Sequence, residues 1–275
     1  MIGAIIGDIV GSAFEFHNIK TKKFPLFNKL STFTDDTVVT CAVAESLMRS
    51  AESGYKDLEE VAVKTFHEIG RKYPTCGFGG KFYKWMMSDV WIPYNSCGNG
   101  SAMRISPVGD IAKDVEQAKK LSNALTCITH NHPEGLKGAE AAAVAKVMLK
   151  NGKTMNQVES YIDKNYYKLD KTVNEIRQET DGHGAEICQV TMPQAFTCLF
   201  DGVDFEDVIR NCVSVGGDSD TIGAIAGGIA EVVYPVPEWM VDEAKSFLTP
   251  DLLDIVERWE DFTHECNRKE TKGRR

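Results

Sequence analysis

The chain has 275 residues, enough for one large domain, and its 43% hydrophobic and 26% charged residues are ordinary for a globular protein. The formal net charge of −9 excludes a general electrostatic attraction to nucleic acids or to anionic lipid. Because no C-x-x-C pair, no basic N-terminal segment and no apolar run of about 18 residues occurs, we expect a cytoplasmic protein without a membrane partner.

Hydrophobic residues recur with the period of α-helices along most of the chain. The segments with this period are, in chain order, 38–51, 58–69, 115–128, 139–148, 205–212, 221–233 and 252–262. Alternation typical of strands is scarce, and its best example is the short segment Ile187–Met192. The pattern predicts an all-α protein.

Clusters of glycine, proline and asparagine predict loops between these helices. The predicted loops are Tyr73–Gly80, Pro93–Gly100, His130–Gly135 and Asp181–Gly184. Asn151-Gly152 is expected to end a helix rather than to form a hairpin. Since no linker or repeat divides the chain, we predict one domain, 1–265, followed by a basic flexible tail, 266–275.

Two helical segments carry glycine at every fourth position. Gly3, Gly7 and Gly11 recur in the first, and Gly223 and Gly227 in 221–233. Each interior glycine costs about 1 kcal/mol relative to alanine, a cost that close approach of another backbone would offset. We therefore expect both segments to be buried centrally, packed against each other.

Two acidic motifs each open a predicted helix, Phe33-Thr34-Asp35-Asp36-Thr37 and Gly216-Gly217-Asp218-Ser219-Asp220-Thr221. Helix capping explains one acceptor at each start, but these motifs supply four carboxylates, which would protonate if buried together without a cation. Their oxygens suit Mg²⁺, Mn²⁺ or Ca²⁺ rather than zinc, and their order is not that of an EF-hand. Two ions that share aspartates would use all four carboxylates. A metal site is favoured over capping alone.

Glu15 is a third acidic feature, and it follows the first glycine-rich segment. Taken alone, it reads as an ordinary solvated glutamate. If the two glycine-rich segments pack together, the end of the first segment brings Glu15 to the predicted metal site.

Five motifs occur in order between residues 3 and 233. They are Gly7-Asp8 with Gly11-Ser12 and Glu15, Thr34-Asp35-Asp36-Thr37, Gly98-Asn99-Gly100-Ser101-Ala102-Met103-Arg104, Thr129-His130-Asn131-His132-Pro133 and Gly216-Gly217-Asp218-Ser219-Asp220-Thr221. In this order they resemble those of the ADP-ribosylglycohydrolase family, which includes dinitrogenase reductase-activating glycohydrolase and the animal ADP-ribosyl-acceptor hydrolases.

The resemblance implies an orthogonal multi-helix bundle with a dinuclear metal cleft at its centre. The cofactors would be two Mg²⁺ or Mn²⁺ ions. One ion would be held by Thr34, Asp35 and Asp36, and the other by Asp218, Asp220 and Thr221.

The resemblance also implies a substrate channel. Its glycine loop would hold the diphosphate of ADP-ribose through backbone N–H groups, which suits the loop's glycines. The substrate-binding residues would be Gly98, Asn99, Gly100, Ser101, Met103 and His130. A second interpretation of His130 is support for the turn at Asn131–Pro133, and His132 is expected to serve that turn.

The implied reaction is metal-dependent hydrolysis of the glycosidic bond between ADP-ribose and an acceptor, on a protein or a small molecule. Glu15, or one of Asp35 and Asp36, would orient the attacking water, and the choice stays open. The polar loop His130–Gly135 favours ADP-ribosyl-arginine as substrate. O-linked serine, O-acetyl-ADP-ribose and nucleic-acid-linked ADP-ribose are the alternatives.

Two readings of other classes compete with this one. The fold of the family also occurs in lens crystallins, so a structural or ADP-ribose-binding protein is an alternative, disfavoured because all the expected ligands are present. A metal phosphoesterase of helical fold would usually carry an adjacent His-Asp pair, which this sequence lacks.

Overall fold

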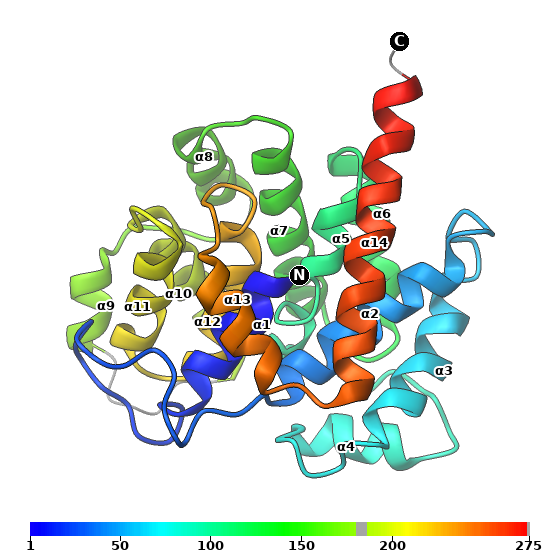
Figure 1. The fold of residues 1–275 in the computed structure, drawn as a ribbon, viewed down its shortest axis with the longest axis horizontal. Coiled ribbons are helices and arrows are strands. Elements are labelled where there is room, and N and C mark those ends of the chain that lie inside the picture. The colour runs from blue at the N-terminus through cyan, green and yellow to red at the C-terminus, as the bar shows by residue number, and fades with distance from the viewer. Residues whose placement is uncertain (180–185, 274–275) are drawn as a thin grey trace.

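The computed structural model describes residues 1–179 and 186–273 of the chain. This part contains fourteen α-helices and one 3-10 helix, which are drawn in chain order in Figure 1. The helices are α1 (Ile2–Ser12), α2 (Asp35–Ser50), α3 (Leu58–Gly70), α4 (Gly80–Met87), η1 (Asn99–Ser101), α5 (Ser106–Ile111), α6 (Val115–Cys127), α7 (Pro133–Lys150), α8 (Met155–Asn165), α9 (Val173–Glu179), α10 (Cys188–Phe200), α11 (Phe205–Val215), α12 (Ser219–Ala230), α13 (Glu238–Ser246) and α14 (Pro250–Gly273). The predicted loop Asp181–Gly184 lies outside the described residues.

The predicted all-α fold is confirmed, and the periodic segments are helices. The strand candidate Ile187–Met192 is wrong, because Ile187 makes one isolated bridge with Gly98 and α10 begins at the next residue. Within α10, Cys188 and Met192 are buried at helical spacing, and this burial outweighs the short alternating pattern. Asn151 caps α7, and Gly152 follows with a positive φ, so the predicted helix end is also confirmed.

The two glycine-rich helices, α1 and α12, pack against each other at the centre of the molecule (Figure 1). A Cβ atom built on Gly3 would lie 2.3 Å from the carbonyl oxygen of Gly227, and one built on Gly7 would lie 2.0 Å from that of Gly223. No side chain fits at these distances. The predicted backbone-to-backbone contact is therefore confirmed, and it accounts for several glycines in buried helices.

The other helices pack around this central pair. α10 and α11 pack against α12, and α2 packs against both α1 and α3. α14 packs along α2 and continues to Gly273, so most of the segment that the sequence predicts to be a tail lies in a helix. This arrangement brings the last turn of α1 and the first turns of α2 and α12 to one place. Among the described residues, no helix is long and apolar enough to cross a membrane.

We expect Gly7→Ala to lower the free energy of unfolding by more than about 3 kcal/mol, because the added methyl group would overlap the backbone of Gly223 and neither helix can move without disturbing the core. Chemical denaturation measures the change. Gly79→Ala is the control, because its φ is −55° and no atom lies within 4 Å of the added Cβ. Equal stability of the two variants would contradict the close helix contact.

Candidate functional site

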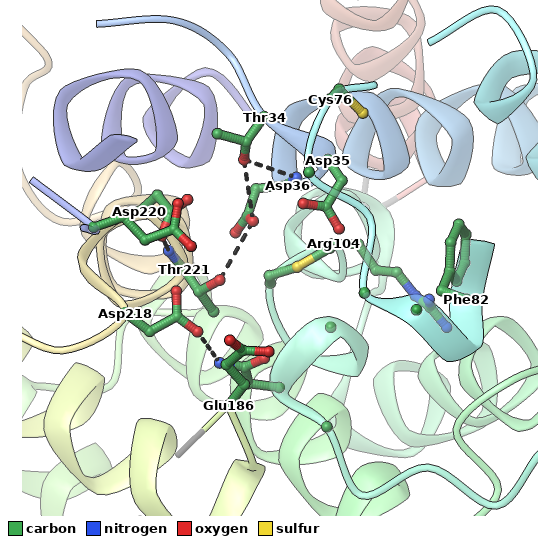
Figure 2. A pocket seen from close by; sticks show the side chains of 18 of the residues that line it. Thr34, Asp35, Asp36, Cys76, Phe82, Arg104, Glu186, Asp218, Asp220 and Thr221 are labelled. Atoms are coloured by element: carbon green, nitrogen blue, oxygen red, sulfur yellow. Dashed lines mark hydrogen bonds between the residues drawn. The ribbon is translucent and has the colours of Figure 1, made fainter. Parts of the chain in front are cut away.

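A cavity of about 710 Å³ opens where α1, α2 and α12 meet. The carboxylates of the two acidic motifs form one side of it, whereas Arg104 and Phe82 lie on the opposite side of the view in Figure 2. The loop between α3 and α4 and the loop before η1 complete the walls. The volume is in the range typical of sites for small-molecule ligands.

Asp8 joins α1 to the start of α2. Its carboxylate accepts hydrogen bonds from the backbone N–H groups of Thr34 and Thr37, both at 3.0 Å, and from both of their hydroxyl groups. Four donors therefore occupy this fully buried carboxylate. Asp8 fixes the beginning of α2 relative to α1, and so fixes where Asp35 and Asp36 lie.

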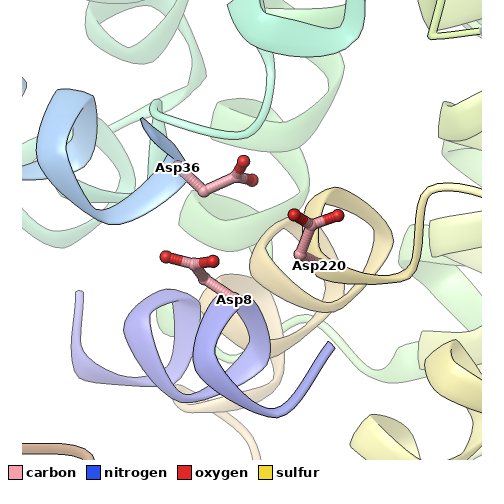
Figure 3. Close-up of side chains that lie close together, drawn as sticks. All are labelled: Asp8, Asp36 and Asp220. Atoms are coloured by element: carbon pink, nitrogen blue, oxygen red, sulfur yellow. The ribbon is translucent and has the colours of Figure 1, made fainter. Parts of the chain in front are cut away.

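The two acidic motifs, far apart in the sequence, meet in space. The hydroxyl of Thr221 lies 3.3 Å from Asp36 Oδ2, which lies 3.4 Å from the hydroxyl of Thr34 (Figure 2). Carboxylate oxygens of Asp8, Asp36 and Asp220 lie within 4.8 Å of one another, and these side chains point toward a common centre in Figure 3.

A second group of acids overlaps the first. Oxygens of Glu15, Asp218 and Asp220 also lie within 4.8 Å of one another, so Asp220 belongs to both groups. The structure thus brings Glu15 to the second acidic motif, as expected from the packing of the glycine-rich helices.

Capping accounts for only part of these motifs. Thr34 is the N-cap of α2 and accepts a hydrogen bond from the N–H of Asp36 at 3.3 Å. Asp218 occupies the N-cap position of α12 but makes no side-chain capping bond. Its carboxylate instead accepts a hydrogen bond of 2.5 Å from the side-chain amide of Asn99. The acids of α12 are therefore not explained by helix capping.

Burial makes the ionised form of the inner carboxylates costly. Burial, followed by repulsion from Asp8, raises the pKa of Asp36 well above its usual value. Burial, followed by repulsion from Asp218, likewise raises the pKa of Asp220. A divalent cation would remove this cost by compensating the negative charges.

The carboxylates nearer the cavity are shifted in the same direction. Burial, followed by repulsion from Asp218, raises the pKa of Glu15 to about 7. Burial, followed by repulsion from Asp8, raises the pKa of Asp35 to about 8. In the absence of a cation, both groups are therefore partly protonated near neutral pH.

The donor set fits a hard cation. Asp36 Oδ1 is buried and has no hydrogen-bond partner among the described residues, so one possible coordinating atom is left unused. The surrounding groups are carboxylates and hydroxyls, which suit Mg²⁺ or Mn²⁺. The side chains that could hold such ions are those of Glu15, Thr34, Asp35, Asp36, Asp218, Asp220 and Thr221.

Three of the N–H groups that the expected cradle would use are engaged within the protein. The N–H of Asn99 donates to the carbonyl oxygen of Glu186, that of Ser101 to Gly98, and that of Met103 to Asn99. These donors are thus already used within the protein. The Ser101 side chain is also not at the cavity, because its hydroxyl is fully buried and donates to the Gly98 carbonyl. The remaining predicted substrate residues do line the cavity; they are Gly98, Asn99, Gly100, Met103 and His130.

The two histidines of the fourth motif have different positions. His130 is buried, lines the cavity and bonds through Nδ1 to the hydroxyl of Thr129 at 2.9 Å. His132 is the N-cap of α7 and accepts a hydrogen bond from the N–H of Glu134, so its predicted role in the turn is confirmed.

Sequence reasoning assigned no role to Asp8 and did not select Glu186. A signal for Asp8 was present, because an acid inside a glycine-faced, otherwise apolar helix must have buried partners. Glu186 lines the cavity beside Asp218, and the charge of Asp218, after burial, raises its pKa. Its position depends on the pairing of the chain near Ile187 with Gly98, for which the sequence holds no signal.

The comparison with known proteins gives the family of the chain. The sequence model of the family described as ADP-ribosylglycohydrolase matches residues 1–269. The chain belongs to the ADP-ribosylglycohydrolase family. All five motifs that resemble this family of hydrolases contribute residues to the one cavity.

Members of this family and a solved structure are similar to the chain over most of its length. The ADP-ribosylhydrolase ARH3 of Gallus gallus is 24% identical, over 85% of this chain and 84% of the relative. The ADP-ribosylarginine hydrolase Tri1 of Pseudomonas putida is 22% identical, over 87% of this chain and 72% of the relative. A solved structure described as an ADP-ribosylglycohydrolase-related protein complex matches with a TM-score of 0.67 and 20% identity, over 92% of this chain and 95% of its own. This last match supports the ADP-ribosylglycohydrolase fold.

We expect the cation-free protein to become less stable as the pH rises from about 4 to about 8. The acids of the site bind protons more tightly in the folded than in the unfolded state, so the unfolded state holds fewer protons in this range and stability falls with pH. Mg²⁺ should restore stability by about 3 kcal/mol at about 100 times its Kd. At a fixed Mg²⁺ concentration, this gain should be larger at the upper end of the pH range, where fewer protons compete for the carboxylates. Thermal denaturation with EDTA or Mg²⁺ tests this.

Two variants control this experiment. Asp220→Asn should lose most of the Mg²⁺ effect, whereas Asp89→Asn, at a fully exposed carboxylate, should keep it. An undiminished Mg²⁺ effect in Asp220→Asn would contradict the assignment of the acidic groups as the cation site.

Proposed function

We propose that the protein hydrolyses the bond between the distal ribose of ADP-ribose and an acceptor, and that the preferred acceptor is an arginine side chain. The observation that carries the proposal is the joining of the two acidic groups through Asp220 at one side of a cavity of about 710 Å³. Such a site presents many hard oxygen ligands to a sugar that lies in the same cavity.

The charge distribution of the cavity supports one orientation of ADP-ribose. Lys81 and Arg104 line the cavity, and after burial their charges are the main causes that lower the pKa of His130. The diphosphate would lie toward these basic groups. The distal ribose would then lie against Asp36, Asp218 and the other acids.

Asp36, Asp218 and Asp220, with the side chains around them, would hold two divalent cations. When bound, such cations supply Lewis-acid stabilisation of charge that develops at the anomeric centre. The chain's own part is to orient the sugar and to position its carboxylates beside it. Asn99 helps by holding Asp218 through a hydrogen bond of 2.5 Å and Thr191 through one of 2.9 Å.

Glu15 is our choice for the group that orients the attacking water and accepts its proton. Its carboxylate is only half-buried and lines the cavity, so a water can reach it. Asp36, by contrast, is enclosed by Thr34 and Thr221. Glu15 lies at the end of α1, beside the shared Asp220, so a water bound there would approach the sugar from the acidic side.

Two observations support arginine as the acceptor. Glu186 lines the cavity beside Asp218 and provides a further carboxylate, and a carboxylate forms charge-assisted hydrogen bonds with a guanidinium group. The similar protein Tri1 is an ADP-ribosylarginine hydrolase by its name.

The proposal predicts release of ADP-ribose from arginine-ADP-ribosylated peptide in Mg²⁺ and loss of this release in EDTA. The experiment compares arginine-linked and serine-linked peptides under both conditions and measures free ADP-ribose by chromatography. Release from the serine peptide alone would keep the hydrolase and reject the arginine preference. No release from either substrate, with no cation bound, would leave the structural or binding protein as the better interpretation.

Two substitutions separate the roles of the acids. Asp220→Asn should lower both cation binding and turnover, the latter by at least about 100-fold, because the shared ligand is weakened. Glu15→Gln should lower turnover to a similar extent with a smaller loss of cation affinity. Calorimetric titration with Mn²⁺ and steady-state kinetics measure the two quantities. Full activity of Glu15→Gln would confine Glu15 to a spectator role.

A further inference from the structure

Asn18 is a half-buried side chain that the proposed reaction does not use, yet its amide makes four hydrogen bonds. The Nδ2 atom donates to the carbonyl oxygens of Phe14 at 2.7 Å, Glu15 at 3.0 Å and Gly217 at 2.9 Å. The Oδ1 atom accepts a hydrogen bond of 2.7 Å from the N–H of Gly217. One side chain therefore connects the segment after α1 to the motif that opens α12, which is 199 residues away in the sequence.

The backbone of Gly217 is arranged for this contact. Gly216 and Gly217 have φ values of 75° and 76°, a conformation that glycine adopts without strain. In this conformation, both polar backbone groups of Gly217 bond to the amide of Asn18. Exchange of the amide oxygen and nitrogen would set donor against donor, so the orientation of the Asn18 side chain is fixed.

The two segments that Asn18 joins differ in how firmly they are held. On one side, Asp218 is the N-cap residue of α12, and the side-chain amide of Asn99 holds its carboxylate at 2.5 Å. On the other side α1 has ended, and among the described residues no backbone–backbone hydrogen bond involves residues 15–19. The bond from Asn18 therefore anchors the backbone of Glu15 to a helix start that is already in place.

The carboxylate of Glu15 lies where its neighbours repel it. Carboxylate oxygens of Glu15, Asp218 and Asp220 lie within 4.8 Å of one another. After burial, repulsion from Asp218 is the largest cause that raises the pKa of Glu15. This repulsion favours movement of Glu15 away from α12, because the segment that carries it is not helical. The bonds of Asn18 oppose such movement.

We propose that Asn18 is a positioning residue that fixes Glu15 beside the start of α12 by bonding to the backbone of both segments. The part that Glu15 plays in turnover rests on the proposed function, whereas the anchoring depends only on the bonds of Asn18. Asn18 acts through Glu15 and is not among the residues that line the cavity.

The anchoring is tested in EDTA and without substrate. Hydrogen exchange measured by NMR gives the protection of the Gly217 amide, which should exchange at least about tenfold faster in Asn18→Ala because its acceptor is lost. Asn28→Ala is the matched control, because Asn28 lies in the same connection between α1 and α2, is also half-buried, and accepts its bond from the nearby N–H of Leu30. Unchanged exchange of Gly217 in Asn18→Ala would overturn the proposal.

In turnover, we expect Asn18→Ala to lower kcat about 10- to 100-fold and to change KM by less than about twofold, because Glu15 is placed to orient water rather than to hold the substrate. Asn28→Ala should keep the wild-type kcat. Asn18→Asp is a second variant that retains the acceptor for Gly217 but lacks the three donated bonds. It should keep the slow exchange of Gly217 and still lose kcat; a wild-type kcat in this variant would contradict anchoring of Glu15.

A double-mutant cycle separates positioning from a general structural effect. In the Glu15→Gln background, Asn18→Ala should lower kcat further by less than about twofold, because no carboxylate is left to be placed. If the two losses multiply instead, Asn18 does not act through Glu15 and the proposal is wrong.

The outcomes also separate this proposal from the function on which it rests. If the wild type releases no ADP-ribose, the proposed function fails, and the exchange of Gly217 alone decides whether Asn18 anchors the segment. If the wild type is active and Asn18→Ala keeps its kcat despite faster exchange, only the positioning of Glu15 by Asn18 is overturned.

Discussion

The contact between α1 and α12 determines where the acids of the site lie. The added Cβ of Gly11 would lie 2.5 Å from the Cα atom of Asp220, so the end of α1 touches the start of α12 directly. At this distance, Asp8 and Asp220 both reach Asp36. Helices that carried side chains at the contact would stand further apart, and the carboxylates would no longer share one centre. The glycines in α1 and α12 thus serve the site as much as the core.

Crowding of carboxylates is the second constraint, and the structure meets it in two ways. Asp8 is satisfied by four hydrogen bonds from the start of α2, so this acid acts as a support for the motif. Asp36 and Asp220 lack such a set of donors, and one oxygen of Asp36 is unpartnered. The acids that fold the site are therefore distinct from the acids that are left for a cation.

The basic wall of the cavity, which carries Arg104, is stabilised in a different way from the acidic wall. Arg104 carries its charge in the protein interior, held by Thr129 and by the ring of Phe66. Burial and the charge of Arg104 hold the pKa of His130 well below its usual value, so the ring stays neutral. The basic wall thus holds a fixed cation beside a neutral histidine. The acidic and basic walls together give the cavity the charge asymmetry on which the proposed orientation of ADP-ribose rests.

The sequence was sufficient to predict the fold class, because helical periodicity and glycine spacing are local properties of the chain. It also predicted that Asp35, Asp36, Asp218 and Asp220 act together, because they stand in two compact motifs. The positions of Asp8, Ser101 and Glu186 could not be predicted from the sequence, since each depends on which distant segment packs beside it. The same holds for the backbone N–H groups of the glycine loop, whose use depends on pairing with Glu186 and on the tight turn of η1. Hydrogen-bond partners that are far apart in sequence leave no local pattern, and for this reason they became visible only in the folded chain.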